Sequence, residues 1–323
     1  MSVCVQLGDT DISIGNHILV EVTKLCNNRC RHCFTGASPT ADKGQPTLLQ
    51  LDNLFRSIQR LGVGAVTLSG GEPLLRKDID RLVEALPEEL QIWLFTSGVG
   101  MDLSRLEKWM ETVSGFAVSI DGGERQHNYL RRSRRSFQEN LGFMKQCAVL
   151  GARCQLQSMV LRGGFDQIQM IVELGETLGV ERILFSHISP DGRGADMETE
   201  QLNAAELDGL HQHITTLQKQ TEVTLRTNLM PRELVDKRFP PVTLHILPDG
   251  KVLPWYGVPK SYALGSLGDY GWDLEALLRS SRMGLLIKHC FSRAKGVAQH
   301  YSGEFVPVDD LLVNTFREPV LCK

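Results

Sequence analysis

Three cysteines in one short stretch are the residues of this sequence with the clearest capacity for chemistry. Cys26, Cys30 and Cys33 have the spacing Cys-x3-Cys-x2-Cys and follow the apolar run at residues 18–20. Thiolates are the ligands that iron–sulfur clusters select, and a four-iron cluster ordinarily takes four of them. A loop with three closely spaced thiolates would hold three irons of a [4Fe–4S] cluster and leave the fourth open to a ligand that is not protein.

Two other interpretations of the cysteines are open. A structural zinc site would need four ligands, so it would have to recruit His32 or a distant side chain. A disulfide framework suits small secreted proteins, and eight cysteines in 323 residues do not reach that density. The spacing alone therefore favours a cluster, and the surrounding elements bear on the choice.

The elements that must position these cysteines alternate between strands and helices. Short β-type runs are expected at residues 17–23, 65–69, 91–96, 115–120, 153–160 and 182–186, after a small strand pair in the first twenty residues. Helices are expected at residues 47–61, 78–86, 136–150, 165–178 and 204–220, with one more around Leu103, Leu106 and Met110. Six strand–helix units in a row predict an α/β fold with a parallel sheet, curled into a partial (β/α)6 TIM-like barrel.

Polar and glycine residues collect where the expected strands end. In barrels of parallel strands, the working residues lie at the carboxyl ends of the strands and in the loops that follow. Besides the cysteines, these positions hold Gly70-Gly71-Glu72-Pro73, Thr96-Ser97-Gly98, Ser119-Ile120-Asp121, then Gln155, Gln157 and Ser158, and finally Ser186-His187. Such a rim predicts a binding mouth at one end of the barrel.

The cysteine spacing, together with Gly70-Gly71-Glu72-Pro73 after the second strand, resembles the radical S-adenosylmethionine (radical SAM) superfamily. His32 stands before Cys33, where that family often has an aromatic residue. The resemblance implies a [4Fe–4S] cluster on the three cysteines, with S-adenosylmethionine (SAM) on the open iron. It also implies reductive cleavage of SAM to a 5′-deoxyadenosyl radical that takes a hydrogen atom from the substrate.

The same resemblance assigns contacts to SAM. Gly70, Gly71, Glu72 and Pro73 would receive the methionine ammonium group, at an edge where a β-carbon would obstruct close approach. Ser119 and Asp121 would face the ribose and carboxylate together with Arg131, because a guanidinium pairs well with a carboxylate. The alternatives are an ordinary strand-to-helix corner at 70–73 and simple strand-end polarity at Ser119 and Asp121.

Three further features belong to the same resemblance. Phe34 would flank the cluster or the adenine, although a core position is the alternative. Ser97 lies in Thr-Ser-Gly, where the family commonly has Thr-Asn-Gly. His187 precedes the stretch at 189–194, whose Pro-x-Gly-Arg shape is similar to radical SAM enzymes with a C-terminal SPASM or twitch extension; a satisfied strand-end histidine or a substrate contact are both open.

The C-terminal third resembles such an extension only in part. Residues 245–254 look like its opening hairpin, with Asp249-Gly250 as the turn. Trp255 follows the hairpin instead of a cysteine, and only Cys290 and Cys322 remain downstream. Two thiolates cannot complete a four-cysteine site unless His289, His300, Cys147 or Cys154 are recruited. We therefore predict a core at residues 1–230 and a reduced SPASM/twitch-like cap, a small α+β unit at 231–323, without an auxiliary cluster.

Without a second redox centre, a net oxidation of the substrate has no obvious electron acceptor in the chain. A redox-neutral outcome such as epimerisation is favoured, with the thiol of Cys290 as hydrogen-atom donor and that of Cys322 as the alternative donor. The alternative for Cys290 is packing, since free cysteine is often buried. Peptide carbon–carbon or thioether cross-linking with an auxiliary cluster, and a non-catalytic iron–sulfur carrier, are the competing functions. The Gly70–Pro73 tetrad argues against the carrier, which needs no SAM site.

The bulk composition bears on which classes of partner the protein could bind. A net charge of −3 and a pI near 6.3 give no sign of the excess positive charge typical of nucleic-acid-binding proteins. No apolar run reaches the ~20 residues of a membrane span, and the N-terminus lacks the shape of a signal peptide. A cytoplasmic enzyme is expected, acting on a peptide or small molecule such as a natural product. An electron donor such as flavodoxin or ferredoxin would reduce the cluster. The basic run Arg131-Arg132-Ser133-Arg134-Arg135 is expected mostly as a solvated turn, with one or two arginines free to meet an anion.

Overall fold

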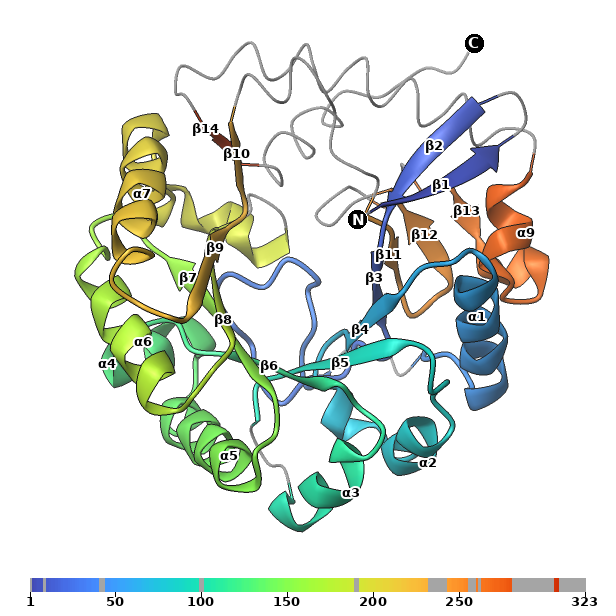
Figure 1. Ribbon diagram of the computed structural model, residues 1–323, viewed down its shortest axis with the longest axis horizontal. Helices are drawn as coiled ribbons and strands as arrows, with labels where there is room; N and C mark the ends of the chain where they lie inside the picture. The colour runs from blue at the N-terminus through green and yellow to red at the C-terminus, as the bar shows by residue number, and fades with distance from the viewer. Residues whose placement is uncertain are drawn as a thin grey trace.

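The fold is a curved sheet with helices on its outer side. The computed structural model describes residues 2–7, 10–40, 44–98, 102–188, 192–231, 243–254, 260, 263–280 and 305–307. Figure 1 shows the central strands as an open arc, with α1 to α7 arranged around the convex side. The loop between β3 and α1, drawn in blue, lies on the concave side. The α/β fold class and the partial barrel are therefore confirmed.

Parallel strands build the arc in sequence order. They are β3 (His17–Glu21), β4 (Ala65–Ser69), β5 (Gln91–Thr96), β6 (Gly115–Ser119), β7 (Cys154–Val160), β8 (Arg182–His187) and β9 (Thr224–Thr227). Each pairs in parallel with the next. The first six match the predicted strands to within two residues at either end. The seventh, β9, extends the sheet beyond the predicted six.

The other edge of the arc is completed from the C-terminal part of the chain. β11 (His245–Ile246) pairs in parallel with β3, and the hairpin continues through β12 (Lys251–Leu253) to β13 (Gly265–Ser266). Together these strands form a ten-stranded sheet within the described part of the chain. The predicted hairpin with its turn at Gly250 (φ 81°) is present. The hairpin belongs to the same sheet as the barrel strands, so the first part of the predicted cap is joined directly to the core.

Two antiparallel pairs lie outside that sheet. β1 (Ser2–Leu7) pairs with β2 (Thr10–Gly15), which is the strand pair expected near the N-terminus. β10 (Leu229–Pro231) pairs with β14 (Phe305–Pro307), a short segment near the C-terminus.

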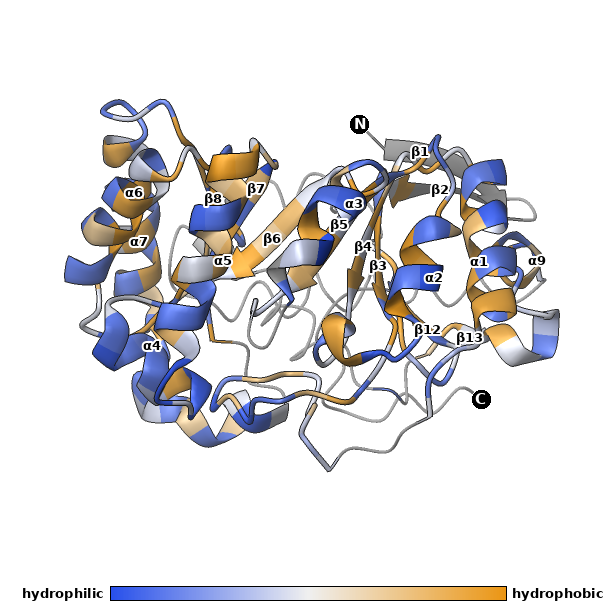
Figure 2. Ribbon diagram, turned by 90° about the horizontal axis from the view of Figure 1, so that it is seen from below, coloured by the Kyte–Doolittle hydropathy of each residue, from blue (hydrophilic) through white to orange (hydrophobic). Residues whose placement is uncertain are grey.

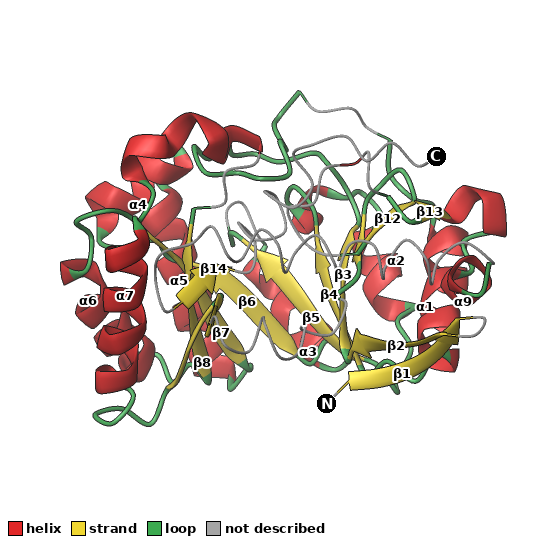
Figure 3. Cartoon of the chain, turned by 90° about the horizontal axis from the view of Figure 1, so that it is seen from above, coloured by secondary structure: helices red, strands yellow, loops and turns green. Residues whose placement is uncertain are grey.

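The helices cover the convex face and bury its apolar side chains. They are α1 (Leu48–Arg60), α2 (Ile79–Glu84), α3 (Leu106–Met110), α4 (Glu124–Arg131), α5 (Ser136–Leu150), α6 (Asp166–Thr177), α7 (Ala204–Leu217) and α9 (Leu274–Leu278). Figure 3 shows the red helices flanking the yellow strands. Figure 2 shows blue and orange alternating on α1 and α7, as expected for helices with one buried stripe.

Capping residues mark the starts of two of these helices. Thr47 and Asn203 accept hydrogen bonds from the amides of Gln50 and Glu206, whose side chains bond back to the cap amides. These reciprocal capping boxes satisfy amides that the first helical turn leaves unpaired. No described helix is long and apolar enough to cross a membrane.

The two faces of the sheet differ in exposure. On β7, buried Cys154, Leu156 and Val160 alternate with half-buried Gln155 and Gln157. Because successive side chains of a strand point to opposite faces, the buried set packs under the helices and the half-buried set lines the concave face. The barrel interior is therefore partly open and polar on the β7 side.

Candidate functional site

The three cysteines lie in the long loop between β3 and α1, and each sulfur has a polar neighbour. All three are free thiols; Cys30 is buried and the other two are half-buried. The amide of Asn28 donates to Cys26 Sγ at 3.4 Å, and Arg131 Nη1 donates to Cys30 Sγ at 3.9 Å. Thr35 Oγ1 lies 3.3 Å from Cys33 Sγ. Donors aimed at sulfur stabilise thiolates and tune the clusters that they bind.

Burial disfavours ionisation of two of these thiols in the absence of a cation. It raises the pKa of Cys26 to about 12, against the opposing hydrogen bond from Asn28. Burial likewise raises the pKa of Cys30, against the opposing charge of Arg131. A bound cation would have to supply the free energy that deprotonates these thiols, so metal uptake would release protons.

The glycines of the tetrad are required by the cysteine loop itself. The amide of Gly71 donates to Thr23 O at 2.7 Å, and that of Glu72 donates to Leu25 O at 2.8 Å. A β-carbon on Gly70 would stand 2.2 Å from Thr23 O, and one on Gly71 would stand 2.2 Å from Leu25 O. Gly70 also has φ 134°, which side chains with a β-carbon rarely adopt. The close approach predicted at this edge is made by the protein's own backbone.

Glu72 is buried and ties the tetrad to the end of β5. Its Oε1 accepts from Thr96 Oγ1 at 2.7 Å and from the amide of Leu74 at 3.2 Å. Its Oε2 accepts from the amide and hydroxyl of Ser97 at 2.8 and 2.7 Å. Burial raises the pKa of Glu72, and these hydrogen bonds oppose the rise. Both oxygens are committed to the scaffold, so Glu72 and Ser97 position the loops after β4 and β5.

A second clamp holds the cysteine loop from the β8 side. Arg193 donates from Nε to Cys30 O at 2.7 Å, from Nη2 to Ala37 O at 3.0 Å, and from its amide to Cys33 O at 3.0 Å. Gly192 (φ 55°) lies so close that a β-carbon would be 2.5 Å from the carbonyl oxygens of Cys33 and Phe34. Gly192 and Arg193, the last two residues of the Pro-x-Gly-Arg shape, therefore have a physical role that sequence reasoning did not assign.

A third arginine joins the two ends of the same loop. Arg76 is buried and donates to Val22 O at 2.7 Å and to Pro46 O at 3.1 Å, while its charge is paired with Asp78 at 2.9 Å. The loop thus begins and ends on one guanidinium, which leaves the cysteines little freedom to separate.

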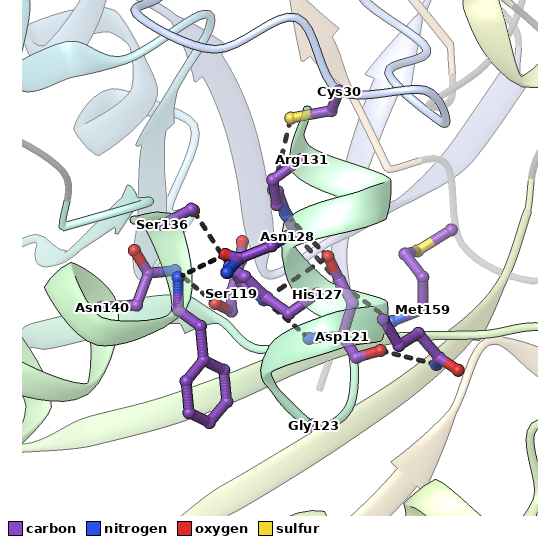
Figure 4. Close-up of polar contacts among 12 residues, drawn as sticks. Cys30, Ser119, Asp121, Gly123, His127, Asn128, Arg131, Ser136, Asn140 and Met159 are labelled. Carbon is purple, nitrogen blue, oxygen red and sulfur yellow. Dashed lines mark hydrogen bonds and ion pairs between the residues drawn. The ribbon is translucent and has the colours of Figure 1, made fainter. Parts of the chain in front are cut away.

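Asp121 and Arg131 form a buried bidentate ion pair beside Cys30 (Figure 4). Arg131 Nε lies 2.6 Å from Asp121 Oδ2, and Nη2 lies 3.0 Å from Oδ1. Burial alone would raise the pKa of Asp121, but the Arg131 charge, with His32 and His127, holds it below its usual value. The guanidinium edge that the resemblance assigned to a SAM carboxylate is therefore occupied by Asp121, and Nη1 faces Cys30.

His127 supports this pair in its neutral form. The amide of Asp121 donates to His127 Nδ1 at 3.1 Å, so Nε2 carries the proton and donates to Ser136 Oγ at 2.9 Å. Burial lowers the pKa of His127 to about 4. The imidazole is thus a fixed hydrogen-bond bridge between the end of β6 and the start of α5.

Ser119 has an unsatisfied hydroxyl. Its carbonyl accepts from Asn140 at 2.6 Å, while its Oγ is buried without a hydrogen-bond partner in the described structure. Ser119 pairs in register with Gln157, so it belongs to the concave face. A buried unpaired hydroxyl is costly, which makes this position a candidate contact for a bound molecule.

Phe34 lies at the β3 edge of the site. Its ring meets that of His245 edge-on, with centroids 6.1 Å apart. His245 Nε2 lies 2.7 Å from Glu21 Oε1, and both side chains are buried. Phe34 thus connects the cysteine loop to the hairpin that closes the sheet, a contact that the sequence did not reveal.

Comparison with known proteins identifies this arrangement. Residues 20–175 match the model of the Radical SAM superfamily. Residues 20–175 therefore form a radical SAM domain. Among curated relatives, the chain is 29% identical over 181 residues to pre-heme d1 synthase of Dinoroseobacter shibae, covering 55% of this chain and 44% of that protein. It is 28% identical over 173 residues to PqqA peptide cyclase of a Methylobacterium strain, covering 53% and 46%.

Solved structures show the same fold. Streptococcus suis SuiB bound to its precursor peptide SuiA has a TM-score of 0.68 at 15% identity, covering 85% of this chain and 67% of that chain. The protein anSMEcpe with bound AdoMet has a TM-score of 0.66 at 16% identity, covering 93% and 90%. The chain spans about half the length of the first curated relatives it matches.

The cofactors of this family are a [4Fe–4S] cluster and SAM, and the residues present fit both. Three free thiols with separate donors stand in one clamped loop, and Ser119 offers an unpaired hydroxyl nearby on the concave face. Among the described residues, no group of three Cys, His, Asp or Glu side chains could hold a single metal ion.

Other predicted site residues divide between the faces of the sheet. Gln155, Gln157 and Ser186 lie half-buried on the concave face, whereas Ser158 and His187 belong to the buried, helix-covered set. Burial lowers the pKa of His187 to about 4. Cys290, Cys322, Trp255, His289 and His300 lie outside the described residues, so the hydrogen-donor role of Cys290 stays a prediction.

Proposed function

We propose that this chain is an enzyme that binds a [4Fe–4S] cluster through Cys26, Cys30 and Cys33 and cleaves SAM reductively. When bound, these cofactors supply a 5′-deoxyadenosyl radical that abstracts a hydrogen atom from the substrate. The observation that carries the proposal is the cysteine loop: three free thiols with their own donors, held by backbone bonds to the Gly70–Pro73 tetrad on one side and by Arg193 on the other.

The chain's own residues would divide the remaining work. Backbone at Gly70 and Gly71, with the Ser119 hydroxyl and Phe34, would line the SAM site, while Glu72, Pro73 and Ser97 fix the neighbouring loops. Arg131 would place positive charge at Cys30, with Asp121 holding its orientation. The half-buried Gln155 and Gln157 would face the substrate.

For the substrate, we propose a peptide or a small natural product, and a redox-neutral outcome such as epimerisation. Peptide-modifying proteins among the relatives and structural neighbours support a peptide. The core would span residues 1–230 and the cap 231–323. Peptide cross-linking with an auxiliary cluster is the alternative within this class. Three relatives favour a second candidate, modification of a tetrapyrrole, because they are named pre-heme d1 synthase, Fe-coproporphyrin III synthase and AdoMet-dependent heme synthase.

The test is anaerobic reconstitution with iron and sulfide, followed by iron counting and SAM cleavage with dithionite. We expect about four irons per chain and 5′-deoxyadenosine that disappears in Cys26→Ala. About eight irons would show an auxiliary cluster and reopen oxidative cross-linking. A wild-type chain that loads iron but releases no 5′-deoxyadenosine, with or without Fe-coproporphyrin III, would contradict the enzyme and favour the iron–sulfur carrier.

A further inference from the structure

The basic run at residues 131–135 begins at the last residue of α4 and continues onto the surface behind Cys30. Arg131 turns inward to Cys30 and Asp121, as described above, while Arg132, Arg134 and Arg135 are exposed. Arg31 in the cysteine loop bonds by its amide to Leu130 O at 2.8 Å, which joins the loop to the end of α4. The surface at Arg132 is thus separated from the Cys30 sulfur by one arginine side chain and a 3.9 Å contact.

Part of this surface carries uncompensated positive charge. Arg135 is paired with Glu139 at 3.3 Å, and Arg31 with Glu200 at 3.3 Å. Arg29, Arg132 and Arg134 are exposed, and no carboxylate of the described residues lies within 4.0 Å of their guanidinium groups. Arg29 directly precedes Cys30, and Arg132 caps α4 in the left-handed conformation (φ 50°).

The sign of this patch is opposite to that of the whole chain, whose net charge is −3. An acidic protein approaching the molecule is therefore repelled by the net charge and attracted by this patch, which orients the encounter. The concave face is reserved for SAM and substrate in the proposed function, so an electron has to arrive from another side.

We propose that Arg29, Arg132 and Arg134 form the docking surface for an acidic one-electron carrier protein that reduces the cluster through Cys30. This inference rests on the proposed function. With flavodoxin as carrier, the anionic flavin hydroquinone gives up one electron and becomes the neutral semiquinone, while the cluster passes from the 2+ to the 1+ state. No bond is made or broken, so the surface needs only to hold the two centres close.

The test measures reduction of the reconstituted cluster by flavodoxin hydroquinone in stopped flow, followed by the loss of cluster absorbance. The charge-reversal variant Arg132→Glu/Arg134→Glu should lower the second-order rate constant about tenfold at low ionic strength. At about 0.5 M salt the difference should shrink to within roughly twofold, because the Debye length falls to a few ångströms. The neutral variant Arg132→Gln/Arg134→Gln should have a rate constant between those of the wild type and the charge-reversal variant. It keeps the test valid if the charge-reversal protein does not fold.

The matched control reverses the same amount of charge elsewhere. Lys77 and Arg81 are exposed and have no ion pair in the described structure, and Arg81 belongs to α2, well away from α4 (Figure 1). Lys77→Glu/Arg81→Glu should keep the wild-type rate after allowance for net charge. Dithionite, a small reductant, should drive SAM cleavage equally in every variant.

Two results would overturn the docking surface while leaving the proposed function intact. One is equal rates for the α4 variants and the control with normal dithionite-driven cleavage. The other is failure of both flavodoxin and ferredoxin to reduce a wild-type cluster that dithionite reduces. Loss of dithionite-driven cleavage in the wild type would instead refute the proposed function, and the surface with it.

Discussion

Replacing Arg193 by methionine removes both side-chain hydrogen bonds that hold the cysteine loop from the β8 side. The bonds to Cys30 O and Ala37 O disappear, while the backbone bond to Cys33 O remains. A hydrogen bond from a charged donor contributes about 1.5–3 kcal/mol when buried. Since Arg193 is half-buried, about 1 kcal/mol for each is the better figure, or about 2 kcal/mol for the loop.

About 2 kcal/mol corresponds to roughly a 30-fold change in the equilibrium between the clamped and unclamped loop. In the proposed function the cluster is bound by all three cysteines together, so we expect the Arg193→Met protein to lose iron to a chelator roughly 30-fold faster than the wild type if release passes through the unclamped loop. Arg193→Lys keeps the charge but lacks the planar fork that reaches two carbonyls, so its rate should fall between the two. The assay follows chelated iron anaerobically by absorbance.

Arg162→Met serves as the control, because Arg162 is an exposed arginine paired with Glu206 at 3.2 Å and its side chain makes no described contact with the cysteine loop. It should change the rate by less than about twofold, as exposed ion pairs contribute little. Equal iron-release rates in wild type, Arg193→Met and Arg162→Met would refute the clamp. A slower release in Arg193→Lys than in the wild type would contradict the fork geometry.

Three further predictions concern the scaffold of the site. Gly71→Ala should prevent stable cluster loading, because its β-carbon would stand 2.2 Å from Leu25 O. Gly142→Ala in α5, whose β-carbon would meet no atom of another element within 4 Å, should instead stabilise the fold by about 0.5–1 kcal/mol. The iron count per chain and the urea midpoint are measured for both variants. Glu72→Gln should lower the free energy of unfolding by about 2–4 kcal/mol, since an amide nitrogen cannot accept from Ser97 or Thr96; an unchanged urea midpoint would contradict it. His127 has a folded pKa of about 4, below the ordinary 6.5, so the unfolded chain binds more protons between these values. Its contribution is complete above pH 6.5 and is lost as pH falls toward 4, by up to about 3 kcal/mol. His127→Gln should make the urea midpoint depend less on pH between pH 4 and 6.5 than in the wild type. If the midpoints of wild type and variant fell in parallel over that range, His127 would not change its protonation on unfolding.

The sequence predicted most of the barrel because its strands are apolar and punctuated by glycine or charged residues. What it missed had weak local signals. α4 has the sequence Glu-Arg-Gln-His-Asn-Tyr-Leu-Arg, without an apolar stripe, and is stabilised by buried His127 and Leu130. β11 is two residues long, and its pairing with β3 is set by tertiary contacts.

At the site, residue types were predictable and their partners were not. The cysteines and the tetrad carry recognisable spacing, so their proximity follows from the order of the strands. Arg193 and Cys30 are 163 residues apart, and a bond from a side chain to a carbonyl leaves no mark on the residue that accepts it. The pairing of Arg131 with Asp121 was also missed, because a guanidinium that suits a ligand carboxylate suits a protein carboxylate equally well.

The cysteine loop is held from two sides of the arc, and this links its geometry to the curvature of the sheet. The tetrad follows β4, and Arg193 follows β8, so the two sets of bonds come from strands separated by β5, β6 and β7. Both sets of hydrogen bonds act on the backbone within residues 23–37. A change in the angle between those strands that moves one set of bonds must therefore also strain the other set. Any molecule that displaces Arg193 must therefore also displace the carbonyls of Cys30 and Cys33. In the proposed function, a substrate that contacts Arg193 would then act on the proposed cluster ligands without touching them.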